Sequence, residues 1–410
     1  MNKVVERPSH IPEQAVFDFD FRLDEGLIAN PHQRVLELLD TAPRVFWTPR
    51  NGGAWVALGY EEVSEALRRP EVFSSVVRPP ADMKKLKEMM PANMPRIPQL
   101  APVSVDPPEH TALRKPLARA FSPKAAMNQL DKIRALTDQL IDNVIDQKHC
   151  EFISAIAEPL PVTVFLDMMG LPVERLAEFR ELVHEVLIPV HGPTNMPMML
   201  RKVADALNET IVARQHDRRD DILSDLWALE VEGQPMTIEL MEDYAVLLFL
   251  AGLDTVINAL GYAVNHLAQN PDLQTALRED PSQIPDAVEE MLRRYSFVVP
   301  VRRVAQDTRL GDFELREDEQ LVVLLAGTGL DERKFERPEV FDLGRKSKSH
   351  LAFGGGPHRC VGMHLARIEL QTVYRQMLSR LPTWRLDPAK PTKYHAGNVI
   401  AVDELHIRWD

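Results

Sequence analysis

The chain has 410 residues, of which 61 are acidic and 48 basic, so its net charge is -13. This acidity excludes a general nucleic-acid binder, which needs a basic surface, and the 45% hydrophobic content excludes a disordered chain. Two cysteines, Cys150 and Cys360, are too few for a disulfide framework. Since no run of about 18 apolar residues suggests a membrane span, we expect a cytoplasmic protein that binds neither membrane nor nucleic acid.

The elements predicted along the chain are mostly helices. Alternating segments predict strands at 44–47 and 54–58, within a β-rich N-terminal part of about residues 40–100. Helical periodicity dominates the part from about 105 to 300, with one helix over 128–145. Short strands such as 320–325 return in the part from about 300 to 410, which also holds a cysteine loop. The pattern predicts one mainly α domain, residues 1–410, with small β-sheets.

The first motif with chemical content begins at Asp106, where two prolines precede Glu109 and His110. Asp106 is expected to cap a helix whose first positions are prolines. His110 and Arg114 are four residues apart, so they share a helix face, and both can donate hydrogen bonds to a carboxylate. A solvated basic face is the alternative interpretation.

The longest predicted helix spans 238–269, with Thr237 as its N-cap and Asn270-Pro271 as its end. At 1.5 Å per residue it is roughly 48 Å long, so its apolar middle must be buried. An acid and an alcohol, Asp254 and Thr255, interrupt that apolar run, and burial of such groups is costly unless they are paired. Gly252 leaves room beside the helix. A structural interpretation remains open, with the Thr255 hydroxyl bonded to the carbonyl four residues earlier and Asp254 in an ion pair.

Glu290 and Arg293 are at positions i and i+3 of a predicted helix, so they share one face. Such a pair by itself is typical of any exposed helix surface.

The segment 353–362, FGGGPHRCVG, is the most informative motif. Its glycines permit positive φ and close approach of the backbone to a bulky group, and a helical pattern follows Cys360. A thiol beside a helix N-terminus is expected to have a lowered pKa and to act as a nucleophile or metal ligand. Two alternatives stay open: a structural cysteine, and a zinc site without the usual paired-cysteine spacing, formed by His350, His358, Cys360 and His364.

The pattern F-x-x-G-x-H-x-C-x-G in 353–362 resembles the cysteine loop of the cytochrome P450 haem-thiolate monooxygenases. The run AGLDT at 251–255, the E-x-x-R at 290–293 and the loop FDLGR at 341–345 follow in the order typical of that family. The resemblance covers nearly the whole chain and implies the P450 fold, with the long helix crossing the distal haem face. It also implies heme b, without a tightly bound flavin or NAD. Several segments are similar to the camphor-hydroxylating subfamily of soluble bacterial enzymes.

The resemblance also implies roles for individual residues. Cys360 is implied to be the haem-iron ligand, and Phe353 and Gly252 are implied to lie beside the haem. Donors to the haem propionates are implied at His110, Arg114, Arg302 and His358. Thr255 and Asp254 are implied to assist dioxygen activation and to relay protons. The implied structural lock consists of Glu290, Arg293 and Arg345.

By position in the family, the substrate pocket is expected to be lined by Leu247, Leu250, Ala251, Val298 and Val399. The camphor enzyme binds its ketone through a tyrosine before the Asp-Pro-Pro turn, but residues 76–105 contain no aromatic side chain here. Methionines, which adapt to irregular apolar pockets, occur instead. We therefore expect a related terpenoid or norisoprenoid, with Met94 in the wall and Gln99 as polar anchor. Alternatively, the Lys- and Met-rich segment 83–94 is only a mobile amphipathic helix.

The expected partners are a small apolar substrate, dioxygen, and a ferredoxin served by an NAD(P)H-dependent reductase. The protein is expected to be a monomer, with a local basic patch at Arg114, Lys115 and Arg119 facing the acidic ferredoxin. A peroxide-driven haem enzyme and a non-catalytic haem carrier or sensor are the alternatives. Neither of them needs the acid–alcohol pair.

Overall fold

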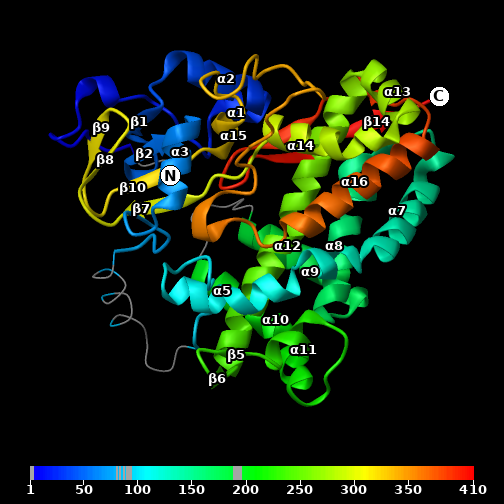
Figure 1. Cartoon of the computed structure of the whole chain (residues 1–410), viewed down its shortest axis with the longest axis horizontal. Coiled ribbons are helices and arrows are strands. Elements are labelled where there is room, and N and C mark those ends of the chain that lie inside the picture. Colours follow the sequence, from blue (N-terminus) through cyan, green and yellow to red (C-terminus); the bar gives the residue numbers. More distant parts are fainter. Residues whose placement is uncertain (1–3, 80–81, 83–84, 86–87, 89–94, 188–195) are drawn as a thin grey trace.

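The computed structural model describes residues 4–79, 82, 85, 88, 95–187 and 196–410 (Figure 1). The predicted pocket residue Met94 and most of the Lys- and Met-rich segment lie outside these residues. The helices are α1 Glu25–Ala29, α2 Pro31–Thr41, α3 Tyr60–Arg68, α5 Glu109–Ala120, α6 Pro123–Met127, α7 Leu130–Ile145, α8 Pro159–Met169, α9 Leu176–Leu187, α10 Met196–His216, α11 Ile222–Trp227, α12 Ile238–Gln269, α13 Pro271–Glu279, α14 Ile284–Arg294, α15 Leu325–Thr328 and α16 Met363–Arg380.

Strands are short and belong to small sheets, which confirms the predicted mainly α class. They are β1 Val45–Thr48, β2 Ala54–Ala57, β3 Phe73–Ser74, β4 His149–Glu151, β5 Glu230–Val231, β6 Gln234–Pro235, β7 Val301–Val304, β8 Thr308–Leu310, β9 Phe313–Leu315, β10 Gln320–Val323, β11 Arg385–Leu386, β12 Lys393–His395, β13 Ala401–Glu404 and β14 His406–Arg408. The largest sheet has the order β1-β2-β10-β7-β3. Its strand β10 pairs in parallel with β2, with Leu321 opposite Trp55, so the sheet joins segments more than 250 residues apart in the sequence.

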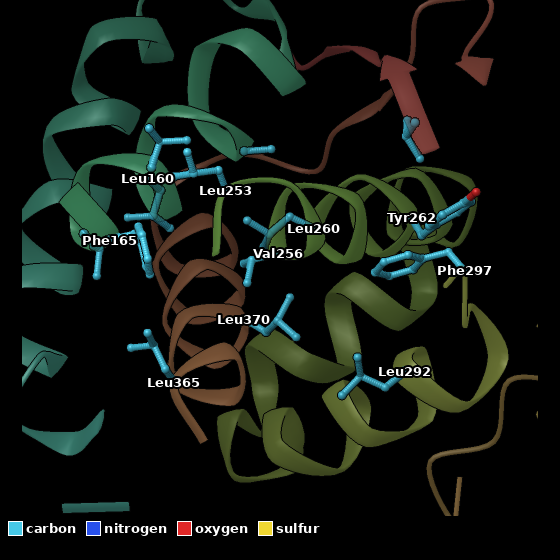
Figure 2. Close-up of a cluster of buried hydrophobic side chains, with 14 of the residues drawn as sticks. Leu160, Phe165, Leu253, Val256, Leu260, Tyr262, Leu292, Phe297, Leu365 and Leu370 are labelled. Carbon is cyan, nitrogen blue, oxygen red and sulfur yellow. The ribbon is translucent and has the colours of Figure 1, made fainter. Parts of the chain in front are cut away.

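Helix α12 forms the centre of the helical part and has the predicted bounds. The Thr237 side chain accepts a hydrogen bond from the Leu240 N–H at its start, and Asn270 ends it. Figure 2 shows its apolar side chains packed against Leu160 and Phe165 of α8 and against Leu365 and Leu370 of α16. In the part of the chain that the structure describes, α12 is the one helix that is long and apolar enough to cross a membrane, and 56% of its most apolar stretch is buried inside the protein. A core helix meets the same criteria.

The helix after the Asp-Pro-Pro turn does not begin as predicted. Helix α5 starts at Glu109, and its N-cap residue is Pro108, whose side chain makes no capping bond. The Asp106 carboxylate instead accepts hydrogen bonds from the Ser75 N–H, at 2.8 Å, and from the Ser74 hydroxyl. The cap prediction was therefore wrong, because a loop 31 residues earlier supplies better donors to this carboxylate.

Glu369 of α16 is a buried acid, 2% exposed, and burial raises its pKa to about 8. The unfolded chain releases this proton near pH ~4.3, so the wild-type stability should fall as the pH rises from there to about 8. We expect Glu369→Gln, which cannot ionise, to gain up to a few kcal/mol relative to the wild type across that interval.

Chemical denaturation at both ends of the interval measures this gain. Glu279→Gln on the exposed end of α13 is the matched control and should follow the wild-type profile. Parallel profiles for Glu369→Gln and the wild type would contradict the expectation.

Candidate active site

The loop that carries Cys360 is shaped by local backbone geometry. A single 3-10 turn covers Gly356–His358, and α16 begins three residues after Cys360. The Cys360 N–H donates to the Phe353 carbonyl at 2.8 Å, which closes the loop. Gly356 has φ +61°, and a Cβ there would lie 2.1 Å from the Leu67 carbonyl oxygen. Only glycine fits this approach to the end of α3, so the loop is held close to the N-terminal part.

The Cys360 thiol is accessible to solvent but surrounded by protein. Burial raises its pKa, and this effect exceeds the opposing influence of the Gly362 N–H and of the Arg114 and Arg367 charges. The prediction that the helix N-terminus lowers the pKa of Cys360 is therefore wrong, because desolvation of the thiolate has the larger effect. Surrounding protein atoms therefore desolvate the thiol although the residue is exposed.

Four predicted donors converge near this loop. The rings of His110 and His358 lie 4.1 Å apart. His358 hydrogen-bonds the Ser75 hydroxyl at 3.0 Å, and Arg114 donates to the Arg359 carbonyl. Arg302, on β7, is 8% exposed, and among the described residues it donates to the adjacent Val301 carbonyl alone. The structure therefore brings together side chains from α5, β7 and the cysteine loop.

The electrostatics of these donors indicate that an anion belongs among them. Burial lowers the pKa of His358 to about 3, with further lowering from the nearby His110, Arg302 and Arg114. Burial also lowers the pKa of His110 and that of Arg302. Both ring nitrogens of His110 are buried without a hydrogen-bond partner. Within the described residues none of the four donors contacts a carboxylate, so two propionates would fit this donor set.

One face of α12 is uncovered in the middle of the helix. It consists of Leu247, Leu250, Ala251, Asp254 and Thr255, each half-buried or exposed. By contrast, Leu248, Phe249 and Leu253 are at most 4% exposed. The spacing of three and four residues places the uncovered set on a single face. A mostly aliphatic face beside an acid and an alcohol is what an apolar ligand would cover.

The acid and the alcohol both have partners within α12. The Thr255 hydroxyl donates to the Ala251 carbonyl at 3.3 Å, as in the structural interpretation. The Asn258 amide donates to the Asp254 carboxylate at 3.2 Å and accepts from the Val402 N–H at 2.8 Å. Sequence reasoning missed Asn258, although its position one turn after Asp254 was a usable indication.

Gly252 lies against another helix rather than beside open space. A Cβ at this position would come 2.5 Å from the Phe165 ring of α8. The expected room beside the helix is therefore filled by protein, and the absent side chain permits the close approach of α8 and α12.

The other predicted pocket residues come from distant parts of the chain. Val298 and Val399 form an isolated antiparallel bridge, and each is half-buried. The exposed Gln99 is held by its backbone N–H, which donates to Asp243 of α12 at 2.7 Å. Arg96 adds an ion pair to Asp243 at 2.5 Å. These contacts anchor the segment that follows residue 94 to the N-terminal half of α12.

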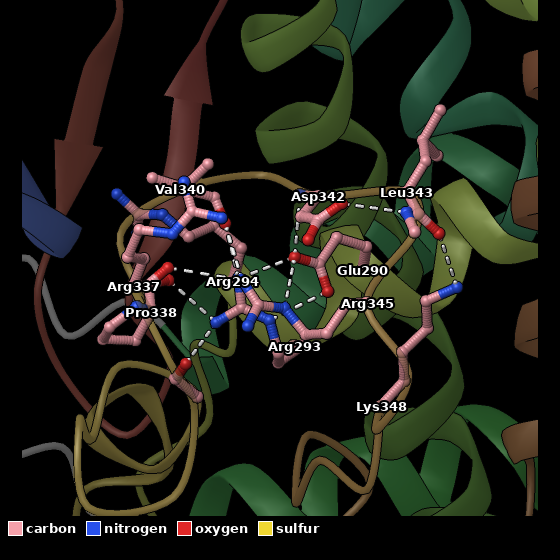
Figure 3. Close-up of polar contacts among 12 residues, drawn as sticks. Glu290, Arg293, Arg294, Arg337, Pro338, Val340, Asp342, Leu343, Arg345 and Lys348 are labelled. Atoms are coloured by element: carbon pink, nitrogen blue, oxygen red, sulfur yellow. Dashed lines mark hydrogen bonds and ion pairs between the residues drawn. The ribbon is translucent and has the colours of Figure 1, made fainter.

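The E-x-x-R pair is fully buried rather than exposed, and Figure 3 shows its polar contacts. Arg293 contacts Glu290 at 2.8 Å, and both side chains are 0% exposed. Arg345 joins Glu290 at 3.0 Å, and the Asp342 N–H donates to the same carboxylate. Arg293 also donates to the Pro338 carbonyl. The three residues predicted as a structural lock therefore lie together and tie α14 to the loop that precedes the cysteine loop.

The zinc alternative is not supported. In the described ranges, no group of three or more His, Cys, Asp or Glu side chains could hold a metal ion. His350 is instead bonded to Glu289 at 3.2 Å. Sequence reasoning missed Glu289, and also Ser75, whose contact with His358 spans 283 residues and has no local indication.

Comparison with known proteins is consistent with this geometry. The family model described as "Cytochrome P450" matches residues 182–404. Cytochrome P450 107B1 of Saccharopolyspora erythraea is 31% identical over 92% of this chain and 92% of its own length. A steroid C26-monooxygenase of Mycobacterium tuberculosis is 32% identical over 85% of this chain and 93% of its own. The crystal structure of CYP101J2 superposes with a TM-score of 0.87 at 32% identity, covering 99% of this chain and 100% of the other.

These matches extend over more than half of the chain and agree with the resemblance to the camphor-type subfamily. The convergent donors, the loop thiol and the uncovered face of α12 fit heme b, the cofactor of the matched family. The chain therefore belongs to the cytochrome P450 family of heme b monooxygenases.

Proposed function

We propose that this P450 hydroxylates a small apolar substrate, a terpenoid or norisoprenoid. It would use dioxygen and two electrons delivered singly by a ferredoxin that an NAD(P)H-dependent reductase reduces. The observation that carries the proposal is the aliphatic face of α12 beside Asp254 and Thr255. When bound, the haem supplies the dioxygen activation, and the protein supplies ligand, orientation and a proton path.

The proposal assigns the iron-ligand role to Cys360. Burial raises the pKa of the thiol, but the Gly362 N–H acts to lower it, in the direction that stabilises the thiolate form that a ligand needs. Arg302 and Arg114 would pair with propionates through planar guanidinium groups, with His110 and His358 as further donors. The orphaned ring nitrogens of His110 support this assignment.

Asp254 and Thr255 are proposed to move protons. Thr255 holds a proton on its hydroxyl, now donated to the Ala251 carbonyl, and Asp254 is adjacent to it in sequence. Burial acts to lower the pKa of His395, but the hydrogen bond that the ring makes with the Asp403 carboxylate and the nearby Asp403 and Asp254 charges together raise it. A peroxide-driven enzyme or a haem carrier would not need this pair, so its presence favours the monooxygenase that uses dioxygen.

The substrate class rests on the lining of the pocket. The proposed walls are aliphatic: Leu247 and Leu250 on α12, and the bridged Val298 and Val399, which are assigned to the pocket by their position in the family. Gln99 is the proposed polar anchor. A spin-state titration with terpenoids, norisoprenoids and steroids tests the class. Shifts with steroids alone would reject the terpenoid proposal, as one relative is a steroid C26-monooxygenase.

The role of Cys360 is tested by the spectrum of the reduced carbon monoxide complex. We expect the absorption band that is specific to thiolate-ligated haem in the wild type and its loss in Cys360→Ser. Cys150→Ser is the matched control, because Cys150 is buried in β4 and burial raises its pKa to about 12. Absence of the band in intact wild-type protein, or its retention in Cys360→Ser, would reject the assignment.

The ferredoxin is proposed to dock on basic side chains around the cysteine loop. Lys115 and Arg119 of α5 are exposed, as is Arg359. The Arg114 guanidinium donates to the Arg359 carbonyl instead, so we do not include it in the basic patch that we expected it to form with Lys115 and Arg119. These three exposed cations provide local attraction on a protein of net charge -13.

Salt dependence tests this docking. We expect the rate of reduction by ferredoxin to fall as ionic strength rises, since salt screens surface attraction. Lys115→Gln with Arg119→Gln should weaken that dependence, whereas Arg309→Gln on the exposed β8–β9 hairpin should not. A rate that salt leaves unchanged would contradict the docking proposal.

We also propose that the protein is a cytoplasmic monomer with one domain.

A further inference from the structure

Glu289 of α14 makes a cross-link to α16 that the proposed mechanism does not use. The Arg367 guanidinium donates to its two carboxylate oxygens at 2.6 and 2.9 Å. The two side chains are only 22% and 26% exposed. A bidentate, partly buried pair of this kind holds the guanidinium in one orientation. Although burial opposes it, these bonds and His350 hold the pKa of Glu289 at about 2.

His350 supports the same carboxylate from the segment before the cysteine loop. Its Nδ1 accepts the Ala352 N–H at 3.2 Å, so the proton of the neutral ring is on Nε2. Nε2 lies 3.2 Å from the Glu289 carboxylate and donates to it. The His350 side chain is 4% exposed. Glu289 therefore connects Arg367 to the start of the cysteine loop through one buried ring.

The oriented guanidinium of Arg367 lies over an aromatic ring of that loop. Its central carbon is 4.6 Å from the centroid of the Phe353 ring, within the range of a cation–π contact. The Phe353 carbonyl accepts the Cys360 N–H. Arg367 thus contacts the residue whose backbone holds Cys360, and its charge acts on the thiol in the direction that favours the thiolate.

We propose that Arg367 is a positioning residue that holds the Phe353 ring and a fixed positive charge beside Cys360, and so sets the reduction potential of the haem iron. This inference rests on the proposed ligand role of Cys360. A fixed positive charge favours the reduced state, which carries one more negative charge. At an effective dielectric constant of about 20, a unit charge at roughly 10 Å changes such an equilibrium by about tenfold or somewhat more.

The test measures the ferric/ferrous midpoint potential of the holoenzyme variants. Arg367→Gln should lower the equilibrium constant for reduction about tenfold, which is about 59 mV for one electron. Glu289→Gln should shift the potential in the opposite direction, because it removes a negative charge. Arg375→Gln is the matched control, since Arg375 is exposed two turns further along α16, and its potential should equal that of the wild type.

A double-mutant cycle tests whether Arg367 acts through Phe353. In a Phe353→Leu background the charge effect of Arg367→Gln should remain, but the part that acts through the ring should be lost, so the total shift should be smaller than in the wild type. Fully additive effects would overturn the claim that Arg367 positions Phe353. If Arg367→Gln retains no haem, Arg367→Lys takes its place in the test, because it keeps the positive charge but lacks the planar guanidinium. The midpoint potential of Arg367→Lys should then be closer to that of the wild type than the midpoint potential of Glu289→Gln is.

Two failures can be separated. Loss of the thiolate-specific carbon monoxide band in the wild type itself would reject the proposed function. If Arg367→Gln keeps that band but has the same midpoint potential as Arg375→Gln and the wild type, this inference alone is overturned.

Discussion

Replacing Arg293 with methionine is expected to lower the free energy of unfolding by about 3–5 kcal/mol. Arg293 is 0% exposed and contacts Glu290, also 0% exposed, at 2.8 Å. The substitution leaves the Glu290 carboxylate with Arg345 as its remaining cation. It removes the Arg293 donor to the Pro338 carbonyl and one of the two guanidinium donors to the Val340 carbonyl, which Arg345 also contacts. The cost is large because buried polar groups that lose their partners cannot be solvated.

Denaturant unfolding of the holoprotein, with haem content followed in parallel, measures this loss. Arg134→Met on α7 is the matched control, because Arg134 and Asp131 have the same i, i+3 spacing but are 51% and 94% exposed. The control should cost less than about 1 kcal/mol. Similar losses for the two variants would show that burial is not what makes the Glu290–Arg293 pair important.

Replacing Thr255 with alanine is expected to uncouple electron use from product formation. The variant should consume the nicotinamide at a comparable rate, while product per nicotinamide falls about tenfold or more, because positioned proton donors typically contribute 10²–10⁴-fold. The folded state should change little, since the hydrogen bond that the hydroxyl makes in the described part of the chain is to the Ala251 carbonyl of the same helix, at 3.3 Å. Product and peroxide assays at matched nicotinamide consumption measure the ratio.

Thr255→Ser retains the hydroxyl and is the control for this experiment. It should keep most of the coupling, whereas Thr255→Ala should release peroxide in place of product. Unchanged coupling in Thr255→Ala would remove the proposed role and leave the hydroxyl with its helix contact alone.

Features that depend on neighbouring residues were predictable from the sequence. Helix α12 has the predicted bounds because an N-cap threonine and an Asn-Pro end enclose one apolar run. The strands β1, β2 and β10 also fall within one or two residues of their predicted positions. The proximity of Glu290, Arg293 and Arg345 followed from family resemblance, since the i, i+3 pair by itself indicated only an exposed helix face.

Features that depend on distant neighbours were not predictable in this way. Asp106 does not cap α5, because Ser75 reaches it from another loop. Gly252 packs against Phe165 of α8, and Arg114 points to the Arg359 carbonyl. The pKa of Cys360 is raised because burial outweighs the local helix terminus. Each of these outcomes was decided by a group far away in the sequence.

By itself the sequence determined the helical class, the long central helix, the cysteine loop and, through its motifs, the family. These depend on periodicity, caps and short spacings, which act over a few residues. Only the tertiary structure decided that the buried ring nitrogens of His110 lie among the converging donors and which face of α12 stays uncovered. It also decided that Glu289 holds Arg367 and that Arg367 lies over the Phe353 ring. Burial and charge at these sites come from segments tens to hundreds of residues apart, and solvation depends on that assembly rather than on any local pattern.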